Sequence, residues 1–309
     1  MGDNSQLSQL VGIYLNYNRK RLAFSTRQMT DLVFRYLIEF KGDISAASLT
    51  VQDAEDFQLI LVNQTSRRTA DSYIKTVRPV FSWAHRHGWI GVDPFGRIRL
   101  YNQPPPDVRV YSPAEISAIL KAAADYLWRA RILAALTAGL RRGEVLNLTV
   151  RDIDFDRRII TVRSKKDTEF TWQWTPKDYE ARQVPLSGAL YNLLISQIIP
   201  SIPSGQPYLM LSEKRYWTLK NRIGSLPERV RITPDENFRP WQQIKKRAGI
   251  VDGCFHDLRR TAITLWSREL PYQEVMKLAG HSDLETTLRY YSAVRDDILE
   301  RASRIVADF

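Results

Sequence analysis

The sequence is poor in several features that mark particular classes of protein. Its single cysteine, Cys254, cannot form a disulfide within the chain, which predicts a reducing compartment. No apolar run approaches the roughly 20 residues that a membrane-spanning helix needs. The opening MGDNSQLSQL lacks the basic and then apolar order of a signal peptide. We therefore expect a cytoplasmic protein that does not span a membrane.

Metal and nucleotide motifs are also scarce. Cys254, His256 and His281 supply only three groups, without the spacing of a zinc site. The segment 152–163 begins like a calcium loop, with three alternating aspartates, but it has arginine where such a loop needs Gly and Glu. A Walker-type glycine loop is missing, so nothing indicates ATP use. We expect neither a metal nor another cofactor.

Acidic residues are outnumbered by basic ones, 34 to 45, which gives a formal net charge of +11. Such a charge favours polyanionic partners, and duplex DNA presents one phosphate charge per roughly 1.7 Å of its axis. Many basic proteins never bind DNA, so charge alone does not decide. The hydrophobic share of 44% and charged share of 26% are ordinary for a globular protein, and 309 residues suffice for two domains.

A proline run marks the clearest boundary. Pro104, Pro105 and Pro106 exclude a helix and favour an extended connector. Before it, apolar residues recur at helical spacing, which predicts a small all-helical unit with exposed basic residues. We expect a helical domain over residues 1–102, a linker over 103–109 and a second domain over 110–309.

The second domain mixes helices with short strands. Ser112-Pro113-Ala114-Glu115 is a capping box with proline at the first helical position. β-branched and aromatic runs predict strands at 159–162, 170–174 and 183–186, and from residue 238 to the end the pattern is helical. The expected fold is mainly α with a small antiparallel β-sheet (α+β).

Two signatures in this domain contain isolated basic residues. In TAGLRRGEV (137–145), Arg141 lies where a helix N-terminus would reinforce its positive field. The alternative is a surface arginine beside a glycine that ends a helix. In PKDYEARQVPL (176–186), Lys177 stands at a hairpin tip and Arg182 on the strand that follows. A lysine at such a tip is usually only solvated.

A third signature, His256-Asp257-Leu258-Arg259, places His256 and Arg259 three residues apart. On a helix they share a face, and a histidine with a forked arginine suits an oxyanion such as phosphate. The alternative is a buried histidine paired with a carboxylate such as Asp257.

The last two signatures lie close together. In LAGHS (278–282), Gly280 would end a helix and leave His281 in the break before the next one. The paired threonines 286 and 287 and then Tyr290-Tyr291 follow on an amphipathic helix. Adjacent tyrosines on such a helix usually mean that one packs and the other is exposed.

Taken in order, these five signatures resemble the catalytic set of tyrosine recombinases and phage integrases. Tyr290 follows His281 by nine residues, and Lys177 precedes Pro185 by eight, as in that family. The resemblance covers roughly 110–302, and residues 1–100 resemble the helical core-DNA-binding domain that precedes it.

The resemblance implies a site-specific recombinase that cleaves and rejoins DNA through a 3′-phosphotyrosyl intermediate. The implied catalytic residues are Arg141, Lys177, His256, Arg259, His281 and Tyr290. A phenol, with a pKa near 10, needs help as a nucleophile. The two arginines would neutralise charge on the phosphate, His256 would act as general base and His281 as a hydrogen-bond donor.

Some assignments stay open in the sequence. By resemblance Lys177 protonates the departing 5′ oxygen, with Lys165 as the alternative. Tyr291 is the alternative to Tyr290, and Glu144 is expected to orient a catalytic arginine or histidine.

The resemblance also implies partners. These are double-stranded DNA recombination sites and a homotetramer held through the C-terminal tail, in an Xer-like rather than lambda-like layout. The rival functions are a type IB topoisomerase and a DNA-binding relative that does not cut. The sequence indicates neither the target site nor whether the role is integration, resolution or transposition.

Overall fold

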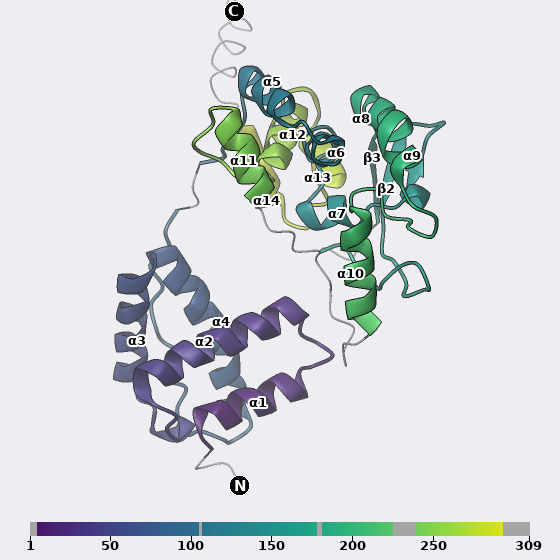
Figure 1. The fold of residues 1–309 in the computed structure, drawn as a ribbon. Coiled ribbons are helices and arrows are strands. Elements are labelled where there is room, and N and C mark those ends of the chain that lie inside the picture. The colour runs from purple at the N-terminus through teal and green to yellow at the C-terminus, as the bar shows by residue number, and fades with distance from the viewer. Residues whose placement is uncertain (1–4, 105–106, 178–180, 225–238, 293–309) are drawn as a thin grey trace, which may run out of the picture. The chain divides into compact units, whose positions relative to one another are not determined.

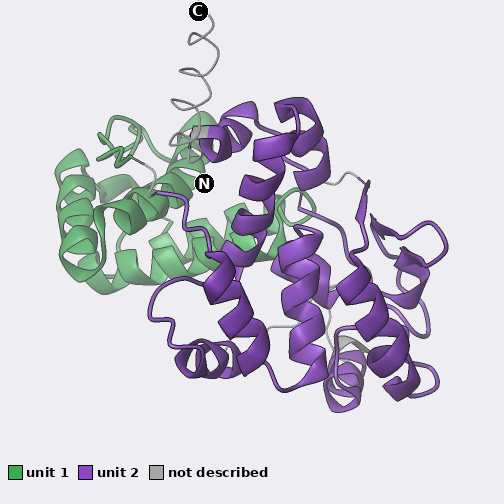
Figure 2. Ribbon diagram, turned by 90° about the horizontal axis from the view of Figure 1, so that it is seen from above, with its two compact units in different colours: residues 1–106 green, residues 107–309 purple. Residues whose placement is uncertain are grey.

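The computed structural model describes residues 5–104, 107–177, 181–224 and 239–292. The chain divides into two compact units, Met1–Pro106 and Asp107–Phe309 (Figure 2). The division falls within the segment 103–109 that the proline run marks as a linker. Each unit has a hydrophobic core of its own.

Unit 1 is helical (Figure 1). Its helices are α1 (Leu7–Tyr17), α2 (Phe24–Lys41), α3 (Val51–Gln64) and α4 (Arg67–Arg86), with a 3-10 turn, η1, at Ala46–Ser48. The helical spacing read from the sequence holds in α2 and α4, where Val33, Leu37, Val77 and Val80 are buried. Met29, on the same helix α2, is 39% exposed.

Unit 2 contains the remaining helices of the described residues. They are α5 (Pro113–Ala122), α6 (Tyr126–Thr137), α7 (Arg142–Leu146), α8 (Gly188–Leu193), α9 (Ile199–Ser201), α10 (Glu213–Gly224), α11 (Arg239–Arg247), α12 (His256–Glu269), α13 (Tyr272–Ala279) and α14 (Leu284–Ser292), with a 3-10 turn, η2 (Val150–Asp152), and a π turn, η3 (Leu194–Ile198). Helix α12 packs against α6, α13 and α14. The predicted capping box opens α5, where Ser112 and Glu115 exchange side chain-to-backbone hydrogen bonds.

A three-stranded antiparallel sheet lies among these helices, in the order β1 (Ile153–Asp154), β2 (Ile159–Val162) and β3 (Arg182–Pro185). Ile160 faces Val184 across the β2–β3 pair, and Val162 faces Arg182 at its end. The expected class, mainly α with a small antiparallel sheet, is therefore confirmed. Within the described ranges, no helix combines the length and apolar character needed to cross a bilayer.

The expected strand at 170–174 is wrong. That segment makes only an isolated bridge, between Lys165 and Trp174. The indole of Trp172 instead stacks on the ring of Tyr208, with centroids 4.0 Å apart and planes at 9°, and donates a hydrogen bond of 2.8 Å to Asn147. Aromatic packing thus holds the segment against the body of the domain, and β-propensity alone could not reveal that.

Candidate active site

Arg141 is the N-cap of α7, immediately before its first turn. Gly139, two residues earlier, has a φ of +59°, and an added Cβ would lie 2.5 Å from the Trp266 ring. Only glycine fits this combination of conformation and close approach. The Gly-Leu-Arg signature therefore has a local structural reason, since the glycine turns the chain so that Arg141 caps the start of α7.

The carboxylate of Glu144 lies at the centre of an arginine cluster and is 3% exposed. Arg182 donates to both its oxygens, at 2.9 and 2.6 Å, and Arg141 donates at 3.1 Å. Nη1 of Arg259 lies 4.0 Å away. Burial by itself would raise the pKa of Glu144, but the bonded guanidinium of Arg182, with Arg259 and Arg141, lowers it below its ordinary value. The carboxylate is thus a buried anion shared by three cations.

Arg259, on α12, is 1% exposed. Its Nη1 donates to the Gly139 carbonyl at 2.5 Å and its Nη2 to the Ala279 carbonyl at 2.6 Å. Burial and then the nearby Arg141 lower its pKa to about 9. Its guanidinium is therefore still charged at neutral pH, in surroundings that an anion would stabilise.

His281 follows Gly280, which ends α13 as the sequence predicts; its φ of +62° makes a left-handed cap. The Gly280 carbonyl accepts a hydrogen bond of 2.7 Å from Arg141. Nδ1 of His281 lies 2.9 Å from the Thr287 hydroxyl, and its ring stacks on Tyr290 with centroids 5.8 Å apart. Burial, followed by Arg259 and Arg141, lowers the pKa of His281 to about 3. The imidazole is therefore neutral at pH 7.

The two adjacent tyrosines of α14 have different surroundings. Tyr290 is 7% exposed and joins a small apolar cluster with Ile263, Val275 and Ala279. The hydroxyl of Tyr291 donates to the Leu270 carbonyl at 2.6 Å. Tyr291 is thus engaged at the end of α12, whereas Tyr290 lies beside His281.

His256 begins α12, one turn before Arg259. Although part of the residue is exposed, desolvation of the ring, followed by Arg259 and Arg260, lowers its pKa to about 4. The Asp257 carboxylate, the partner that the sequence offered for a buried His256, accepts hydrogen bonds from the Cys254 amide at 2.6 Å and from Arg260 at 2.7 Å. His256 is therefore a neutral imidazole at pH 7.

The two candidate lysines differ in burial. Nζ of Lys165 lies 2.8 Å from a carboxylate oxygen of Asp152, and the two side chains are 9% and 2% exposed. Burial lowers the pKa of Lys165. Lys177 is exposed, in the turn that precedes β3, and residues 178–180 lie outside the described ranges. Asp152, the first of the three alternating aspartates in the segment 152–163, thus pairs with Lys165.

Arg182 is the site residue whose role the sequence did not reveal. Its position on a strand was evident, but its inward orientation was not. The available signal is alternation, because Arg182 and Val184 are both buried on one face of β3 while Gln183 and Pro185 are exposed. An arginine at an inward position requires a buried anion, and Glu144 is that anion.

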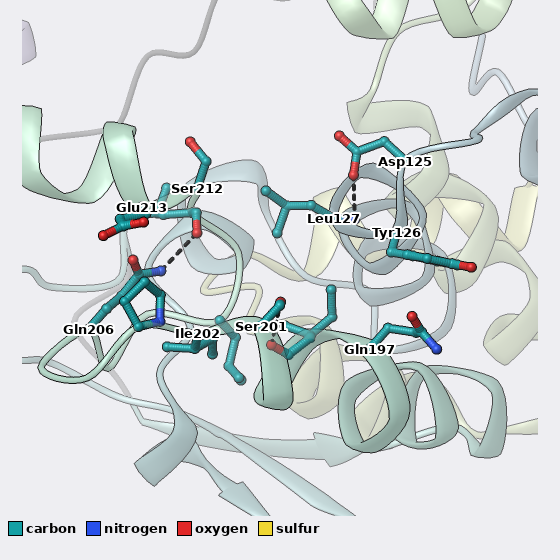
Figure 3. Close-up of a pocket in the computed structure, with 13 residues that line it drawn as sticks. Asp125, Tyr126, Leu127, Gln197, Ser201, Ile202, Gln206, Ser212 and Glu213 are labelled. Atoms are coloured by element: carbon teal, nitrogen blue, oxygen red, sulfur yellow. Dashed lines mark hydrogen bonds between the residues drawn. The ribbon is translucent and has the colours of Figure 1, made fainter.

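A separate hollow of about 300 Å³ lies elsewhere in unit 2, lined by residues that include Asp125, Tyr126, Gln206 and Glu213 (Figure 3). It contains none of the predicted site residues. In the ranges that the structure covers, no group of three or more His, Cys, Asp or Glu side chains could hold a metal ion.

The cluster as a whole combines guanidinium groups, neutral imidazoles and a phenol. Arg141, Arg259, His281 and Tyr290 lie together through the contacts above, and His256 lies one helical turn from Arg259. Fixed cations of this kind can bind a phosphate and stabilise charge that develops on it. The adjacent phenol can serve as a nucleophile.

Comparisons with known proteins agree with one another. The chain is 26% identical to a "Tyrosine recombinase XerC-like" protein of Caldanaerobacter subterraneus, over 74% of this chain and 63% of the relative, which is less than two thirds of that protein. It is 24% identical to "Tyrosine recombinase XerC" of Corynebacterium glutamicum, over 84% of this chain and 82% of the relative.

Solved structures share the fold. The Tn1549 transposon integrase in complex with transposon right end DNA has a TM-score of 0.71 at 18% identity, over 96% of this chain and 99% of that one. A lambda integrase dimer bound to a core site has a TM-score of 0.69 at 14% identity, over 94% of this chain and 78% of that one. The profile described as "Phage integrase family" matches residues 109–297, more than half of the sequence. The chain therefore belongs to the phage integrase family.

Proposed function

We propose that this protein is a site-specific DNA recombinase or integrase in which Tyr290 is the nucleophile. The observation that carries the proposal is the stacking of Tyr290 on His281, beside the arginine cluster around Glu144. The Tyr290 oxygen attacks a backbone phosphorus and forms a 3′-phosphotyrosyl bond. The bond from phosphorus to the 5′ oxygen breaks, and that strand departs with a 5′-hydroxyl.

Each side chain has a role that follows from its charge. Arg141 and Arg259 bind the non-bridging oxygens and stabilise the extra negative charge of the pentacoordinate transition state. His256, a neutral imidazole at pH 7, accepts the phenol proton as general base. His281 donates a hydrogen bond to the phosphate through the ring nitrogen that Thr287 does not engage.

Lys177 protonates the departing 5′ oxygen in this scheme. Two observations favour it over Lys165. The ammonium of Lys165 is buried and paired with Asp152 at 2.8 Å, and releasing it would remove the buried one of the two cations that balance this carboxylate. Lys177 is exposed in the turn before β3. Its ammonium is thus available to the substrate.

The reaction is reversible without an external source of energy, because the phosphotyrosyl bond conserves the energy of the broken phosphodiester. A 5′-hydroxyl of another strand attacks the phosphorus, the Tyr290 oxygen leaves and takes back its proton, and a new phosphodiester forms. No step requires a metal or a nucleotide.

We assign core-DNA binding to residues 1–102, the linker to 103–109 and catalysis to 110–309. The partners are double-stranded recombination sites, and the active assembly is a homotetramer on paired sites. The integrases with the same fold were solved bound to DNA, which supports the DNA partner. The tail that we propose to link protomers, 293–309, lies outside the described residues. We place the activity in the cytoplasm, at the nucleoid.

Covalent trapping on a nicked suicide DNA substrate tests the proposal. The substrate carries the end sequence of the element that encodes the protein, and wild type is compared with Tyr290→Phe and Tyr291→Phe. We expect a denaturation-resistant adduct in wild type and in Tyr291→Phe, but not in Tyr290→Phe. Binding without an adduct in wild type would favour a non-cutting DNA-binding protein. Relaxation of any supercoiled plasmid by a monomer would favour a type IB topoisomerase.

A further inference from the structure

Arg182 joins the sheet to the phosphate-binding residues through a single buried side chain. It is 8% exposed, and all three of its guanidinium nitrogens donate hydrogen bonds. Nη1 and Nη2 bind the two oxygens of Glu144, and Nε donates to the Leu278 carbonyl at 2.9 Å. A planar fork with this many bonds has one orientation, which a lysine could not reproduce.

The backbone that carries His281 lies directly against Arg182. Leu278 is near the end of α13, two residues before Gly280. A Cβ added to Gly280 would lie 3.0 Å from Cδ of Arg182. The start of β3 is therefore fixed relative to both the Arg141–Glu144 pair and the turn before His281.

The segment that contains Lys177 has an anchor at each end. On one side Trp174 is buried and exchanges two backbone hydrogen bonds with Lys165, at 2.7 and 3.1 Å. On the other side Arg182 makes the last pair of the β2–β3 ladder, opposite Val162. Residues 175–181 lie between these anchors. Because Lys177 is only five residues from Arg182, a fixed Arg182 limits the positions that the Lys177 ammonium can occupy.

We propose that Arg182 is a positioning residue that aligns Lys177 with the departing 5′ oxygen of the bound phosphate. The proposal rests on the proposed function, because it requires Lys177 to be the general acid. The alternative is that Arg182 only compensates the charge of Glu144. In that case its loss would disturb the phosphate-binding arginines and leave proton transfer to the leaving group unaffected.

The leaving group separates these alternatives. A 5′ oxygen must receive a proton as its bond to phosphorus breaks, so cleavage requires the lysine. A sulfur atom in the same bridging position leaves as a thiolate, since thiols have far lower pKa values than alcohols. DNA with this sulfur therefore cleaves without a general acid. If a variant is slow because the general acid is misaligned, its cleavage rate recovers on the sulfur substrate. If it is slow because phosphate binding is impaired, its rate stays low on both substrates.

The experiment measures single-turnover formation of the Tyr290 adduct on matched suicide substrates with oxygen or sulfur at the 5′-bridging position. The proteins are wild type, Lys177→Met, Arg182→Gln and Arg182→Lys. On oxygen we expect Arg182→Gln to be slowed about 100-fold, the cost of misplacing a catalytic group by about 1 Å. On sulfur we expect both Lys177→Met and Arg182→Gln to approach the wild-type rate. Arg182→Lys, which keeps the charge but loses the fork, should behave like Arg182→Gln.

Arg163→Gln is the matched control. Arg163 lies just beyond β2 and pairs with Asp152 at 3.2 Å, but its side chain is 49% exposed and it does not contact Glu144. We expect its rates to match wild type on both substrates. DNA affinity and melting temperature, measured for every variant, identify any that fails to fold.

The outcomes separate the proposal from the function on which it rests. If wild type forms no adduct on either DNA, the proposed function is wrong. If sulfur does not rescue Lys177→Met, the lysine assignment is wrong and the proposal for Arg182 fails with it. If sulfur rescues Lys177→Met while folded Arg182→Gln stays equally slow on both substrates, or is not slowed at all, the function stands and the positioning role is wrong.

Discussion

The ammonium of Lys165 and the carboxylate of Asp152 form a buried ion pair of 2.8 Å, in which Asp152 also accepts hydrogen bonds from the backbone and hydroxyl of Thr149. Arg163, 49% exposed, still pairs with Asp152 at 3.2 Å, so removing Lys165 leaves the buried carboxylate only partly compensated and costs about 3 kcal/mol, the low end for a broken buried pair. We expect Lys165→Met to lower the free energy of unfolding by that order. Lys177→Met, at an exposed position, should change it by less than about 0.5 kcal/mol.

Urea unfolding followed by tryptophan fluorescence measures this difference. Trp128, Trp172, Trp174, Trp217, Trp241 and Trp266, all but two of the eight tryptophans, lie in unit 2, so the signal reports mainly on that unit. In cleavage assays Lys177→Met should instead be the more damaged of the two variants. We expect folded Lys177→Met to be slowed by a factor of about 10²–10⁴. Equal stability of the two variants would contradict the structural role of Lys165.

Glu144→Gln should be among the most damaging substitutions that keep side-chain size. It removes the negative charge of the carboxylate that Arg141, Arg182 and Arg259 share, and leaves their positive charges close to one another. We expect a loss of stability of about 3–5 kcal/mol in urea unfolding and, for protein that folds, loss of adduct formation.

Glu115→Gln provides the comparison for that substitution. Glu115 pairs with Arg109, and both side chains are about 30% exposed. Surface pairs contribute less, about 0–1 kcal/mol, although Glu115 also receives a backbone hydrogen bond in the capping box of α5. Equal destabilisation by the two substitutions would mean that the Glu144 cluster adds nothing beyond an ordinary ion pair.

Much of the architecture was predictable because it depends on local chemistry. The capping box at Ser112, the helix end at Gly280 and the strand at Ile159–Val162 each follow from a few neighbouring residues. The order and spacing of the five signatures indicated the family before any geometry was known. These features need no information about distant contacts.

The features that were missed depend on tertiary partners. The segment 170–174 has the composition of a strand, but Trp172 packs on Tyr208, which is 36 residues later. Arg182 binds Glu144 across 38 residues, and nothing near either residue in the sequence identifies the other. Lys165 is simply the alternative to Lys177 in the sequence until Asp152 is placed beside it. The burial and pairing on which our preference for Lys177 rests therefore came only from the structure.

The two tyrosines of α14 should separate stability from catalysis. The Tyr291 hydroxyl donates to the Leu270 carbonyl at 2.6 Å, so Tyr291→Phe loses this hydrogen bond and about 1 kcal/mol of unfolding free energy. It should still form the covalent adduct. Tyr290→Phe should bind DNA with wild-type affinity in a gel-shift assay but form no adduct. An adduct that persists in Tyr290→Phe and disappears in Tyr291→Phe would reverse the assignment.

The neutral state of His281 predicts how stability depends on pH. Its pKa is about 3 in the folded protein and near 6.5 when unfolded, so between these values the unfolded chain binds more protons. The unfolding free energy therefore falls as pH decreases from 6.5 toward 3. Allowing for partial exposure of the ring, we expect His281 to account for about 1–2 kcal/mol of the loss between pH 7 and 4.5.

His281→Asn lacks this titration while keeping a polar side chain opposite Thr287. Its unfolding free energy, measured with wild type in urea at half-unit steps from pH 7 to 4.5, should decrease less steeply. The difference between the two curves isolates His281, because carboxylates that titrate near pH 4.5 are common to both proteins. Parallel curves over this range would mean that His281 titrates near its ordinary pKa, and that burial, with Arg259 and Arg141, does not hold it neutral.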